Sequence, residues 1–523
     1  MPLEQQPARA GDGGGGCRAA CVLQVQPPVD DVHCDVQPRG ARAALGQPPR
    51  LRQQPQLHVS AGSHVRRGVE HGTPQRRHVR RGVLAQQRVV RLLGLLQVGA
   101  TPGGGGQRIG AIKRRRAKPA TSGLVQRVLL LVPPQLLPPL AGLKVADFSM
   151  VYAGPICARM LSDCGASVTK IEPLGLGDTV RGNARVFAHF NAGKSSVQID
   201  LDSTEGQELA HRLIDEADVV IENYRPGVMQ RFGLDYASVK ARRPDLVYCS
   251  ISGFGQSGPA AQRAAYAPVA HAASGYDIAH MRAQIHTDTQ VGENDRPPAS
   301  GIMIADMLTG AYAFGAIQTA LLGRVSSGLG DHIDITMLES MMMLIPGQQQ
   351  AAQIANAPKF GGFLPVATTS GFVMLCIVSD KNFAGLCAAI ERPDLRTDPR
   401  FVRIARIRNV RDLVTEVERW SATRTVEECE AQFDLHGVPC SRYNTAADLF
   451  DEPQLQHRGA FTVFNDDEGE YFVQNLPFQF ASVDNATTPH SPAPGEHTDA
   501  VLADHLNLDE NAIADLRKRG IVE

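Results

Sequence analysis

The chain has 523 residues, of which 43% are hydrophobic, and a formal net charge of −1. This length and apolar content are ample for a large buried core and for more than one lobe. The near-zero charge conceals a division: residues 1–138 hold 21 Lys and Arg against 6 Asp and Glu, whereas residues 139–523 hold 32 against 48. The first part is therefore strongly basic and the second strongly acidic, so the mean describes neither.

Residues 1–138 are predicted to be a disordered, basic, low-complexity extension. They contain no Phe, Trp or Tyr, and Gly, Pro, Gln and Arg recur, so they can bury little apolar surface. The run KRRR at 113–116 would suit nucleic-acid or acidic-lipid binding, but no aromatic residues are interleaved for base stacking. We favour a solvated tail, or residues translated upstream of the native start, and expect neither nucleic acid nor membrane as a partner.

Several classes of protein are excluded by what the chain lacks. The ten cysteines show no CxxC pair and no His spacing typical of a zinc site, which favours free thiols in a reducing compartment and no structural metal. The apolar run at 128–140 is broken by prolines and too short to span a bilayer, so a cytoplasmic protein is expected. The absence of GxGxxG, P-loop and GxSxG signatures argues against classical dehydrogenases, P-loop ATPases and α/β-hydrolases.

From about residue 140 the pattern alternates between strand and helix, which predicts an α/β fold with a mainly parallel sheet covered on both faces. Strands are expected at 141–149, 167–173, 218–222, 245–252 and 332–337, and helices at 153–166, 204–217, 235–242 and 306–324. A strand at 371–378 is expected to open a smaller α/β lobe that extends to about residue 435. We expect the segments after residue 435 to form turns and exposed helices.

Asp306 is the main candidate for chemistry. It lies at the N-terminal edge of a predicted helix, and the small residues Gly310, Ala313 and Gly315 that follow permit close packing. The helix dipole and free N–H groups stabilise an anion at a helix start, which suits a carboxylate nucleophile that must be ionised at neutral pH. The alternative is a purely structural N-cap, and residue types alone favour it.

Eight short motifs occur in one order between about residue 139 and the C-terminus. They are VYAGPICARMLSDCGASVTKIEPLGLGD, NAGKSSVQIDL, ADVVIENYRPGVMQRFGL, SISGFGQSGP, IADMLTGAYAFGAIQTALLGR, GLGDHIDITMLES, HGVPCSRYNTAADLFDEPQLQHRGAF and PGEHTDAVL. Together they resemble the class III CoA-transferase family, the group of formyl-CoA transferase and the carnitine-CoA transferases. Chance agreement of eight motifs in the family's order is very improbable, whereas any single one is weak.

The resemblance implies a CoA-transferase that moves CoA between an acyl-CoA donor and a free carboxylic acid. Asp306, in IADMLTG, would be its covalent nucleophile, forming aspartyl intermediates. The substrates would be an acyl-CoA and a small carboxylic acid, and no tightly bound cofactor is expected. The acyl donor and acceptor stay open, although succinyl-CoA is a common donor in the group.

The resemblance also implies residues that bind CoA. Val151, Tyr152 and Ala153 would lie in the first strand-to-helix turn near the pantetheine thiol, Lys194 and Arg231 would contact phosphate or ribose, and Asn223 and Tyr224 would contact the CoA chain at the carboxyl edge of the sheet. A solvated surface charge is the alternative for the two cations. Tyr152 stands where formyl-CoA transferases place a glutamine, so their acceptor preference does not transfer.

The implied fold is a Rossmann-like large domain, a smaller α/β domain, and a chain that returns to the large domain, within an interlocked homodimer. The expected divisions are the extension at 1–138, the first part of the large domain at 139–345, a linker and small domain at 346–435, and the return at 436–523. The family's glycine-rich lid has no clear counterpart, with only FGG at 360–362. A longer connection at 276–300 either shapes the acyl pocket or forms a surface loop.

Two alternatives remain. An α-methylacyl-CoA racemase shares the fold and the aspartate but needs an adjacent His-Asp pair as acid and base, and Tyr266 and Ala267 occupy those places here. His271 is nearby and reads as a structural histidine. A non-catalytic CoA-binding protein need not keep Asp306, whose presence favours an enzyme.

Overall fold

The computed structural model describes residues 137–283, 296–355 and 363–523. The predictions for the basic extension up to residue 136, for FGG at 360–362 and for the middle of the 276–300 connection therefore lie outside the described residues. The described part begins immediately before the first predicted strand.

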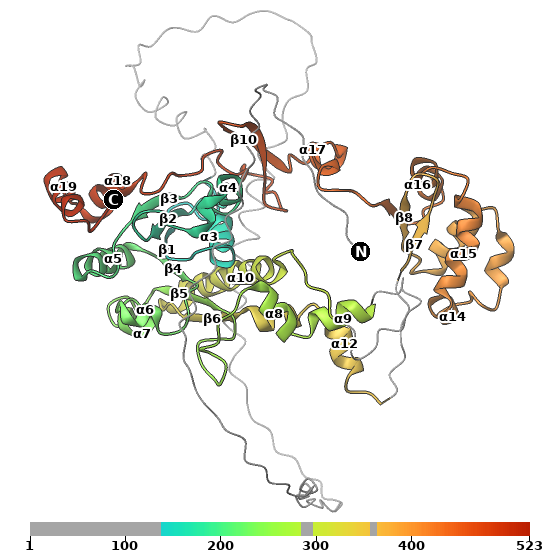
Figure 1. The fold of residues 1–523 in the computed structure, drawn as a ribbon, viewed down its shortest axis with the longest axis horizontal. Coiled ribbons are helices and arrows are strands. Elements are labelled where there is room, and N and C mark those ends of the chain that lie inside the picture. Colours follow the sequence, from blue (N-terminus) through green and yellow to red (C-terminus); the bar gives the residue numbers. More distant parts are fainter. Residues whose placement is uncertain (1–136, 284–295, 356–362) are drawn as a thin grey trace, which may run out of the picture. The chain divides into compact units, whose positions relative to one another are not determined.

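A six-stranded sheet in the order β3-β2-β1-β4-β5-β6 organises residues 144–336 (Figure 1). Every neighbouring pair is parallel, so the predicted parallel α/β sheet is confirmed. Its strands are β1 (Lys144–Asp147), β2 (Ser167–Glu172), β3 (Ser195–Gln198), β4 (Val219–Glu222), β5 (Val247–Ser252) and β6 (His332–Thr336). The strand order reverses between β1 and β4, which is where ligands bind in doubly wound sheets of this order.

Helices connect these strands. They are α3 (Ala153–Asp163), η1 (Thr179–Gly182), α4 (Ala184–Asn191), α5 (Thr204–Glu216), α6 (Val228–Arg231), α7 (Tyr236–Val239), α8 (Ala267–Ala273), α9 (Tyr276–Ala283), α10 (Ile304–Ser327), α11 (Met337–Met342) and α12 (Pro346–Ala351). The predicted helix at 235–242 is reduced to the single turn of α7. The predicted helix at 306–324 is confirmed as α10, and it begins two residues earlier.

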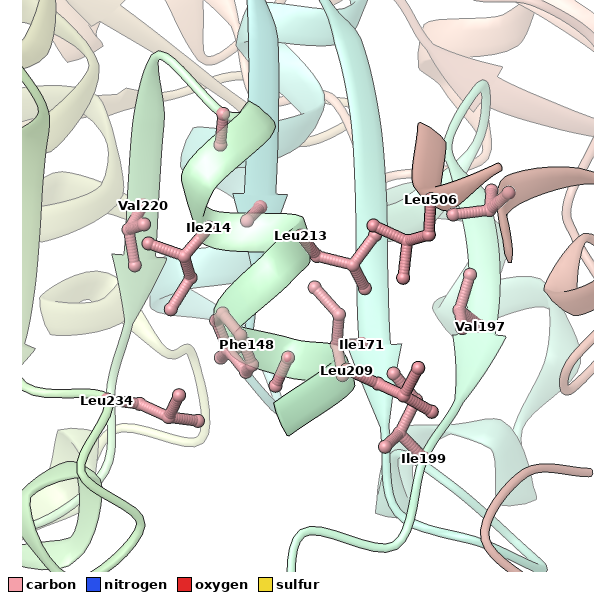
Figure 2. Packing of buried hydrophobic residues seen from close by; sticks show 14 of the residues in the cluster. Phe148, Ile171, Val197, Ile199, Leu209, Leu213, Ile214, Val220, Leu234 and Leu506 are labelled. Carbon is pink, nitrogen blue, oxygen red and sulfur yellow. The ribbon is translucent and has the colours of Figure 1, made fainter. Parts of the chain in front are cut away.

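Alternate side chains of the strands enter two different cores, as expected for a sheet that is covered on both faces. Val219 and Ile221 of β4 belong to one cluster with α3 and α10, whereas Val220 belongs to the other with α5. Figure 2 shows Leu209 and Leu213 of α5 directed toward the strands in this second core. Both faces of the sheet are therefore covered by apolar cores, although buried polar side chains such as Lys170 and Ser250 also lie within the strands.

Helices α3 and α10 pack closely because Gly310 has no side chain. A Cβ atom there would lie 2.3 Å from Cγ2 of Ile156 and 2.6 Å from the carbonyl oxygen of Ala153. Ala313 is also buried at this contact. Gly315 is exposed, and a Cβ atom there would meet nothing within 4 Å, so the packing role predicted for it is wrong.

Residues 363–442 form a small α/β unit with its own core. Its three-stranded antiparallel sheet has the order β7-β8-β9, with β7 (Pro365–Ala367), β8 (Phe372–Leu375) and β9 (Cys440–Arg442). Its helices are α13 (Asp380–Ala389), η2 (Pro393–Thr397), α14 (Ile404–Arg408), α15 (Val410–Ser421) and α16 (Val426–Leu435). The strand expected at 371–378 is confirmed as the shorter β8.

The C-terminal segment packs against the six-stranded sheet. It contains η3 (Asp448–Phe450), α17 (Pro453–His457), the antiparallel hairpin of β10 (Phe461–Asp466) and β11 (Gly469–Gln474), α18 (Thr498–Leu506) and α19 (Glu510–Lys518). Leu502 and Leu506 of α18 enter the core that contains α5, and Figure 2 shows Leu506 there. Val522 forms an isolated bridge with Ile199, just after β3. The hairpin was not predicted from the sequence.

Two further properties concern the chain's chemistry. All seven cysteines in the described part are free thiols. No helix among the described residues is both long and apolar enough to cross a membrane.

We predict that Gly310→Ala destabilises the protein by about 1–3 kcal/mol, because the added methyl group meets the backbone of α3 and forces the helices apart. Gly315→Ala is the matched control in the same helix. It should be neutral or stabilising by about 0.5–1 kcal/mol, since alanine favours the helix and has space. Urea unfolding of both variants tests this, and equal stabilities would contradict the close contact.

Candidate active site

The two strands at the reversal point are tied together by Asn223, which directly follows β4. Its Oδ1 accepts a hydrogen bond from the backbone N–H of Met150 at 2.8 Å, and its Nδ2 donates to the Met150 carbonyl at 2.7 Å. Met150 lies in the loop between β1 and α3. The amide of Asn223 thus holds this loop through both its oxygen and its nitrogen, and its predicted contact with CoA stays a prediction.

A buried ion pair also holds the loop between β1 and α3. Nζ of Lys170 lies 3.0 Å from Oδ2 of Asp178 and donates to the carbonyl of Ser149 at 2.7 Å. The Asp178 carboxylate accepts from the N–H of Val151 at 3.1 Å. Val151 has φ of +70°, a conformation that is costly for a β-branched residue. The ion pair therefore stabilises a strained turn at the start of α3.

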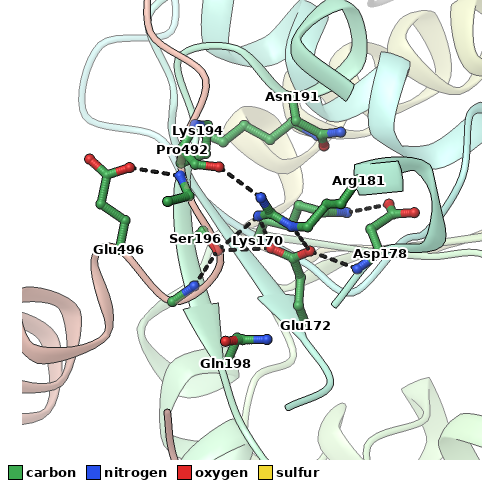
Figure 3. Close-up of polar contacts among 12 residues, drawn as sticks. Lys170, Glu172, Asp178, Arg181, Asn191, Lys194, Ser196, Gln198, Pro492 and Glu496 are labelled. Atoms are coloured by element: carbon green, nitrogen blue, oxygen red, sulfur yellow. Dashed lines mark hydrogen bonds and ion pairs between the residues drawn. The ribbon is translucent and has the colours of Figure 1, made fainter. Parts of the chain in front are cut away.

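A second ion pair braces the segment that carries Asp178. Arg181 donates from Nε to Oε1 of Glu172 at 2.8 Å and from NH1 to the carbonyl of Pro492 at 2.8 Å (Figure 3). Glu172 also accepts from the N–H of Asp178 at 2.9 Å and from Oγ of Ser196 at 2.8 Å. The loop after β1 thereby rests on a network that extends to the C-terminal segment.

Asp306 occupies the third position of α10, only 7% exposed, and faces the start of α3. Burial raises the pKa of its carboxyl group to about 6, and hydrogen bonding from the backbone N–H of Ala153 and from its own N–H offsets part of this rise. The N-cap of α10 is Met303, so Asp306 is not the N-cap. The carboxylate is therefore ionised at neutral pH but more basic than an ordinary aspartate.

The other predicted residues of the first turn lie beside it. Ala153 is the buried first residue of α3, and Tyr152 is its half-buried N-cap. The ring of Tyr152 lies 4.6 Å from that of Phe190 between centroids. Ala153 and Asp306 thus lie together where α3 meets α10, and the CoA contacts predicted for Val151, Tyr152 and Ala153 stay predictions.

Tyr224 and Arg231 lie on the segment after β4. The N–H of Tyr224 donates to Oε2 of Glu222 at 2.9 Å, and burial raises the pKa of the phenol to about 12, so it stays neutral. Arg231 ends α6 and is exposed, with its guanidinium 5.6 Å from the ring of Phe232. It forms no ion pair with any other described residue. It is therefore free to meet an anionic ligand.

The sequence allowed two roles for Lys194, a contact with phosphate or ribose and a solvated surface charge, and the structure agrees with neither. Its side chain is fully buried, and Nζ is 2.8 Å from Oδ2 of Asp147, 2.9 Å from Oδ1 of Asn191 and 3.0 Å from the carbonyl of Pro155. Burial raises the pKa of Asp147, but the charges of Lys194 and Lys170 and the hydrogen bonds from Lys194 and Ser149 together hold it below its usual value. All three ammonium protons are used within the protein. The predicted phosphate contact is thus not supported, and neither is a solvated surface charge.

The positions that matter for a racemase are also resolved. Tyr266 is 70% exposed and Ala267 is the buried first residue of α8, so no acid–base pair stands there. His271 is fully buried, and its Nε2 accepts from the backbone N–H of Ala305 at 3.1 Å. Its structural reading is confirmed, although its partner is the residue next to Asp306.

One group in the described part of the chain has the composition of a metal site. His490, Glu496 and His497 place their ligand atoms within 4.8 Å of one another. Nδ1 of His497, however, accepts from the N–H of Ser196 at 3.3 Å, so the neutral ring carries its proton on Nε2, where a metal would bind. We propose no metal here, and the absence of a structural metal stays a prediction.

Comparison with known proteins identifies the family. The sequence pattern of CoA-transferase family III matches residues 140–498. The chain belongs to CoA-transferase family III. Within it, succinate–glutarate CoA-transferase of Agrobacterium fabrum is 32% identical over 413 residues, which cover 72% of this chain and 98% of that protein. Succinyl-CoA–D-citramalate CoA-transferase of Chloroflexus aurantiacus is 30% identical over 407 residues, covering 73% and 98%.

A solved structure agrees with this assignment. The crystal structure of a CAIB/BAIF family protein from Brucella suis superposes with a TM-score of 0.60 at 32% identity, covering 71% of this chain and all of that one. The shared part is the transferase itself, and the basic extension lies outside the family match.

Several residues that build the transferase site had no role in the sequence analysis. Lys170 and Asp178 lie in the quoted motif VYAGPICARMLSDCGASVTKIEPLGLGD, and Asp147 ends β1. A buried charge within a strand is the signal that could have found Lys170 and Asp147, because such charges require partners. The identity of those partners is a matter of tertiary structure.

We predict that Lys194→Met lowers the free energy of unfolding by about 3–5 kcal/mol, because Asp147 is left as a buried charge without its partner. Arg231→Met, at an exposed cation, should change it by less than about 0.5 kcal/mol. Urea unfolding compares the two. A stable Lys194→Met variant whose KM for acyl-CoA alone rises would restore Lys194 as a ligand contact.

Proposed function

We propose that the transferase moves CoA from an acyl-CoA donor to a free carboxylic acid through covalent intermediates on Asp306. The observation that carries this proposal is the placement of a buried, ionisable carboxylate against the N–H of Ala153 at the start of α3. A nucleophilic carboxylate must be ionised yet basic enough to attack, and a pKa of about 6 meets both needs at neutral pH.

In the first half of the reaction, a carboxylate oxygen of Asp306 attacks the thioester carbonyl carbon. A C–O bond forms, the C–S bond breaks, and CoA leaves as the thiolate, which gives a mixed anhydride. The thiolate then attacks the side-chain carbonyl of Asp306, releasing the donor as a free carboxylate and leaving an aspartyl-CoA thioester.

In the second half, the acceptor carboxylate attacks this thioester and releases the CoA thiolate again. The thiolate attacks the acceptor's carbonyl in the new anhydride, which releases the new acyl-CoA and restores the carboxylate of Asp306. Two similar acids are exchanged, so the proposal requires no ATP and no metal.

The start of α3 supplies the electrostatic part of the proposal. The N–H of Ala153 and the positive end of the helix dipole face the carbonyl that becomes tetrahedral on Asp306, and they favour the negative charge that develops on its oxygen. The burial of Asp306 also limits the access of water to the anhydride. Tyr152 and Arg231 are proposed to meet the thiol end and the phosphates of CoA respectively.

The substrates we propose are short dicarboxylic acids. The two relatives named above are called succinate–glutarate and succinyl-CoA–D-citramalate CoA-transferases. Succinyl-CoA with glutarate is accordingly the first pair to assay. An α-methylacyl-CoA racemase gains no support, because Tyr266 and Ala267 supply no acid–base pair.

We further propose a cytoplasmic, interlocked homodimer. Free cysteines are typical of reducing compartments. Exposed apolar side chains on α10 and α11, among them Leu322, Val325 and Met342, would be buried by contact with a second chain. Sedimentation equilibrium of the full chain should give twice the mass of one chain, and a monomer at micromolar concentration would remove this part.

We predict that Asp306→Asn abolishes CoA exchange between succinyl-CoA and glutarate, with kcat lower by about 10⁴-fold or more, because an amide cannot form the anhydride. Asp331→Asn, at an exposed aspartate, is the control and should keep full activity. Hydroxylamine added during turnover should modify Asp306 in the wild type only when both substrates or acyl-CoA are present. Full activity of Asp306→Asn would end the proposal.

The same variant has an expected effect on stability. The pKa of Asp306 is 3.8 as an ordinary aspartate and about 6 in the fold, so at pH 7 its ionisation disfavours the folded state. Asp306→Asn should therefore be more stable at pH 7 by on the order of 1–3 kcal/mol. If Asp306→Asn is inactive but at least as stable as the wild type in urea unfolding, its loss of activity is due to the missing carboxylate and not to unfolding.

A further inference from the structure

His271 binds the first turn of the helix that carries the nucleophile. It lies in α8, is fully buried, and its Nε2 is 3.1 Å from the backbone nitrogen of Ala305. Ala305 is the second residue of α10 and directly precedes Asp306. A histidine from one helix therefore caps the start of another.

The start of α10 needs this cap. The first N–H groups of a helix have no partner within it, and Met303 at the N-cap provides no side-chain acceptor. The N–H of Met307 donates to the carbonyl of Met303 and begins the regular ladder. Without His271 the N–H of Ala305 would be unsatisfied. A carboxylate at the third helical position, such as Asp306, commonly turns back to bind such groups.

We propose that His271 is a positioning residue that takes the N–H of Ala305 in place of Asp306 and so leaves the nucleophile's carboxylate directed at Ala153. The proposal rests on the function proposed above for Asp306. His271 touches neither substrate nor CoA. With the N–H of Ala305 taken by His271, the Asp306 carboxylate is left to its own N–H and to that of Ala153.

The bond sets the protonation state of His271. Because the backbone N–H is the donor, Nε2 carries no proton, and the proton of the neutral ring is on Nδ1. Nδ1 is buried without a hydrogen-bond partner among the described residues. Burial lowers the pKa of His271, and the charge of Asp277 offsets part of this. Protonation of the ring would remove the acceptor of the Ala305 N–H, so only neutral His271 can form this hydrogen bond.

The charges next to His271 are few. Asp277 on α9 is the charge that acts on it, and the ring of Tyr276 on the same helix lies 6.0 Å away between centroids. The buried residues of α11 in the same core, Met337 and Met341, are uncharged. No cation among the described residues of these helices is buried at this place. If the pKa of Asp306 changes after substitution of His271, the change can therefore be attributed to loss of the hydrogen bond between His271 and the N–H of Ala305.

The test compares His271→Ala with His271→Gln in the full chain. Alanine removes the acceptor, whereas the glutamine Oε1 can accept the N–H of Ala305. We expect kcat for CoA exchange to fall about 100-fold in His271→Ala with little change in KM for acyl-CoA, and to recover largely in His271→Gln. Ser274→Ala is the matched control. Its hydroxyl donates to the carbonyl of His271 within α8.

The pH profile separates positioning from a general structural role. In the wild type, kcat/KM should fall as the pH decreases through about 6, because the Asp306 carboxylate becomes protonated. In His271→Ala the carboxylate binds the freed N–H, which favours its ionised form, so the inflection should move to lower pH. In His271→Gln it should stay near the wild-type value. Reduced activity with an unmoved inflection in His271→Ala would overturn the proposal.

Measuring Asp306→Asn beside the His271 variants distinguishes failure of the proposed function from failure of the positioning role. Full activity of Asp306→Asn ends the proposed function, whereas an inactive Asp306→Asn beside wild-type kinetics in His271→Ala overturns only the positioning role. If His271→Ala does not fold, His271→Leu takes its place, because leucine also removes the acceptor of the Ala305 N–H but fills the buried space. A folded Leu variant with an unmoved inflection contradicts the proposal, and an inflection moved to lower pH beside an unmoved one in His271→Gln supports it.

Discussion

The site depends on the close approach of α3 and α10, which exists because Gly310 has no side chain where the backbone of Ala153 passes. This approach places the carboxylate of Asp306 against the start of a second helix. Burial makes the carboxylate more basic, and hydrogen bonding from the N–H of Ala153 offsets part of the rise in pKa. The resulting pKa of about 6 suits the nucleophilic role that we propose for Asp306.

Charges and amides that touch no substrate hold this arrangement from two sides. On the side of α3, the Lys170–Asp178 pair and Asn223 fix the loop after β1, including the strained Val151. On the side of α10, His271 takes the free N–H of Ala305. Buried polar groups are costly unless satisfied, so each partner that forms these bonds also makes the loop or helix start rigid. The catalytic geometry is thus supported by groups outside it.

Much of the fold could be predicted from the sequence, and the failures have physical causes. Apolar runs such as 219–222 and 247–252 are buried on both faces, which is typical of parallel strands, and the sheet follows. The hairpin of β10 and β11 was missed although 461–474 alternates apolar and polar residues around a turn. Gly315 was assigned to the helix contact, but a glycine in a helix indicates close packing only on the face that meets another element.

The sequence by itself determined the family, because motif order is a property of the chain. Residue type alone favoured a helix cap for Asp306, and the motifs around it made it the proposed nucleophile. Only the tertiary structure decided which side chains are free to act. Lys194 pairs with Asp147 and Asn223 binds Met150, across 47 and 73 residues. Burial and partners of this kind arise when distant segments meet, and no local pattern contains them.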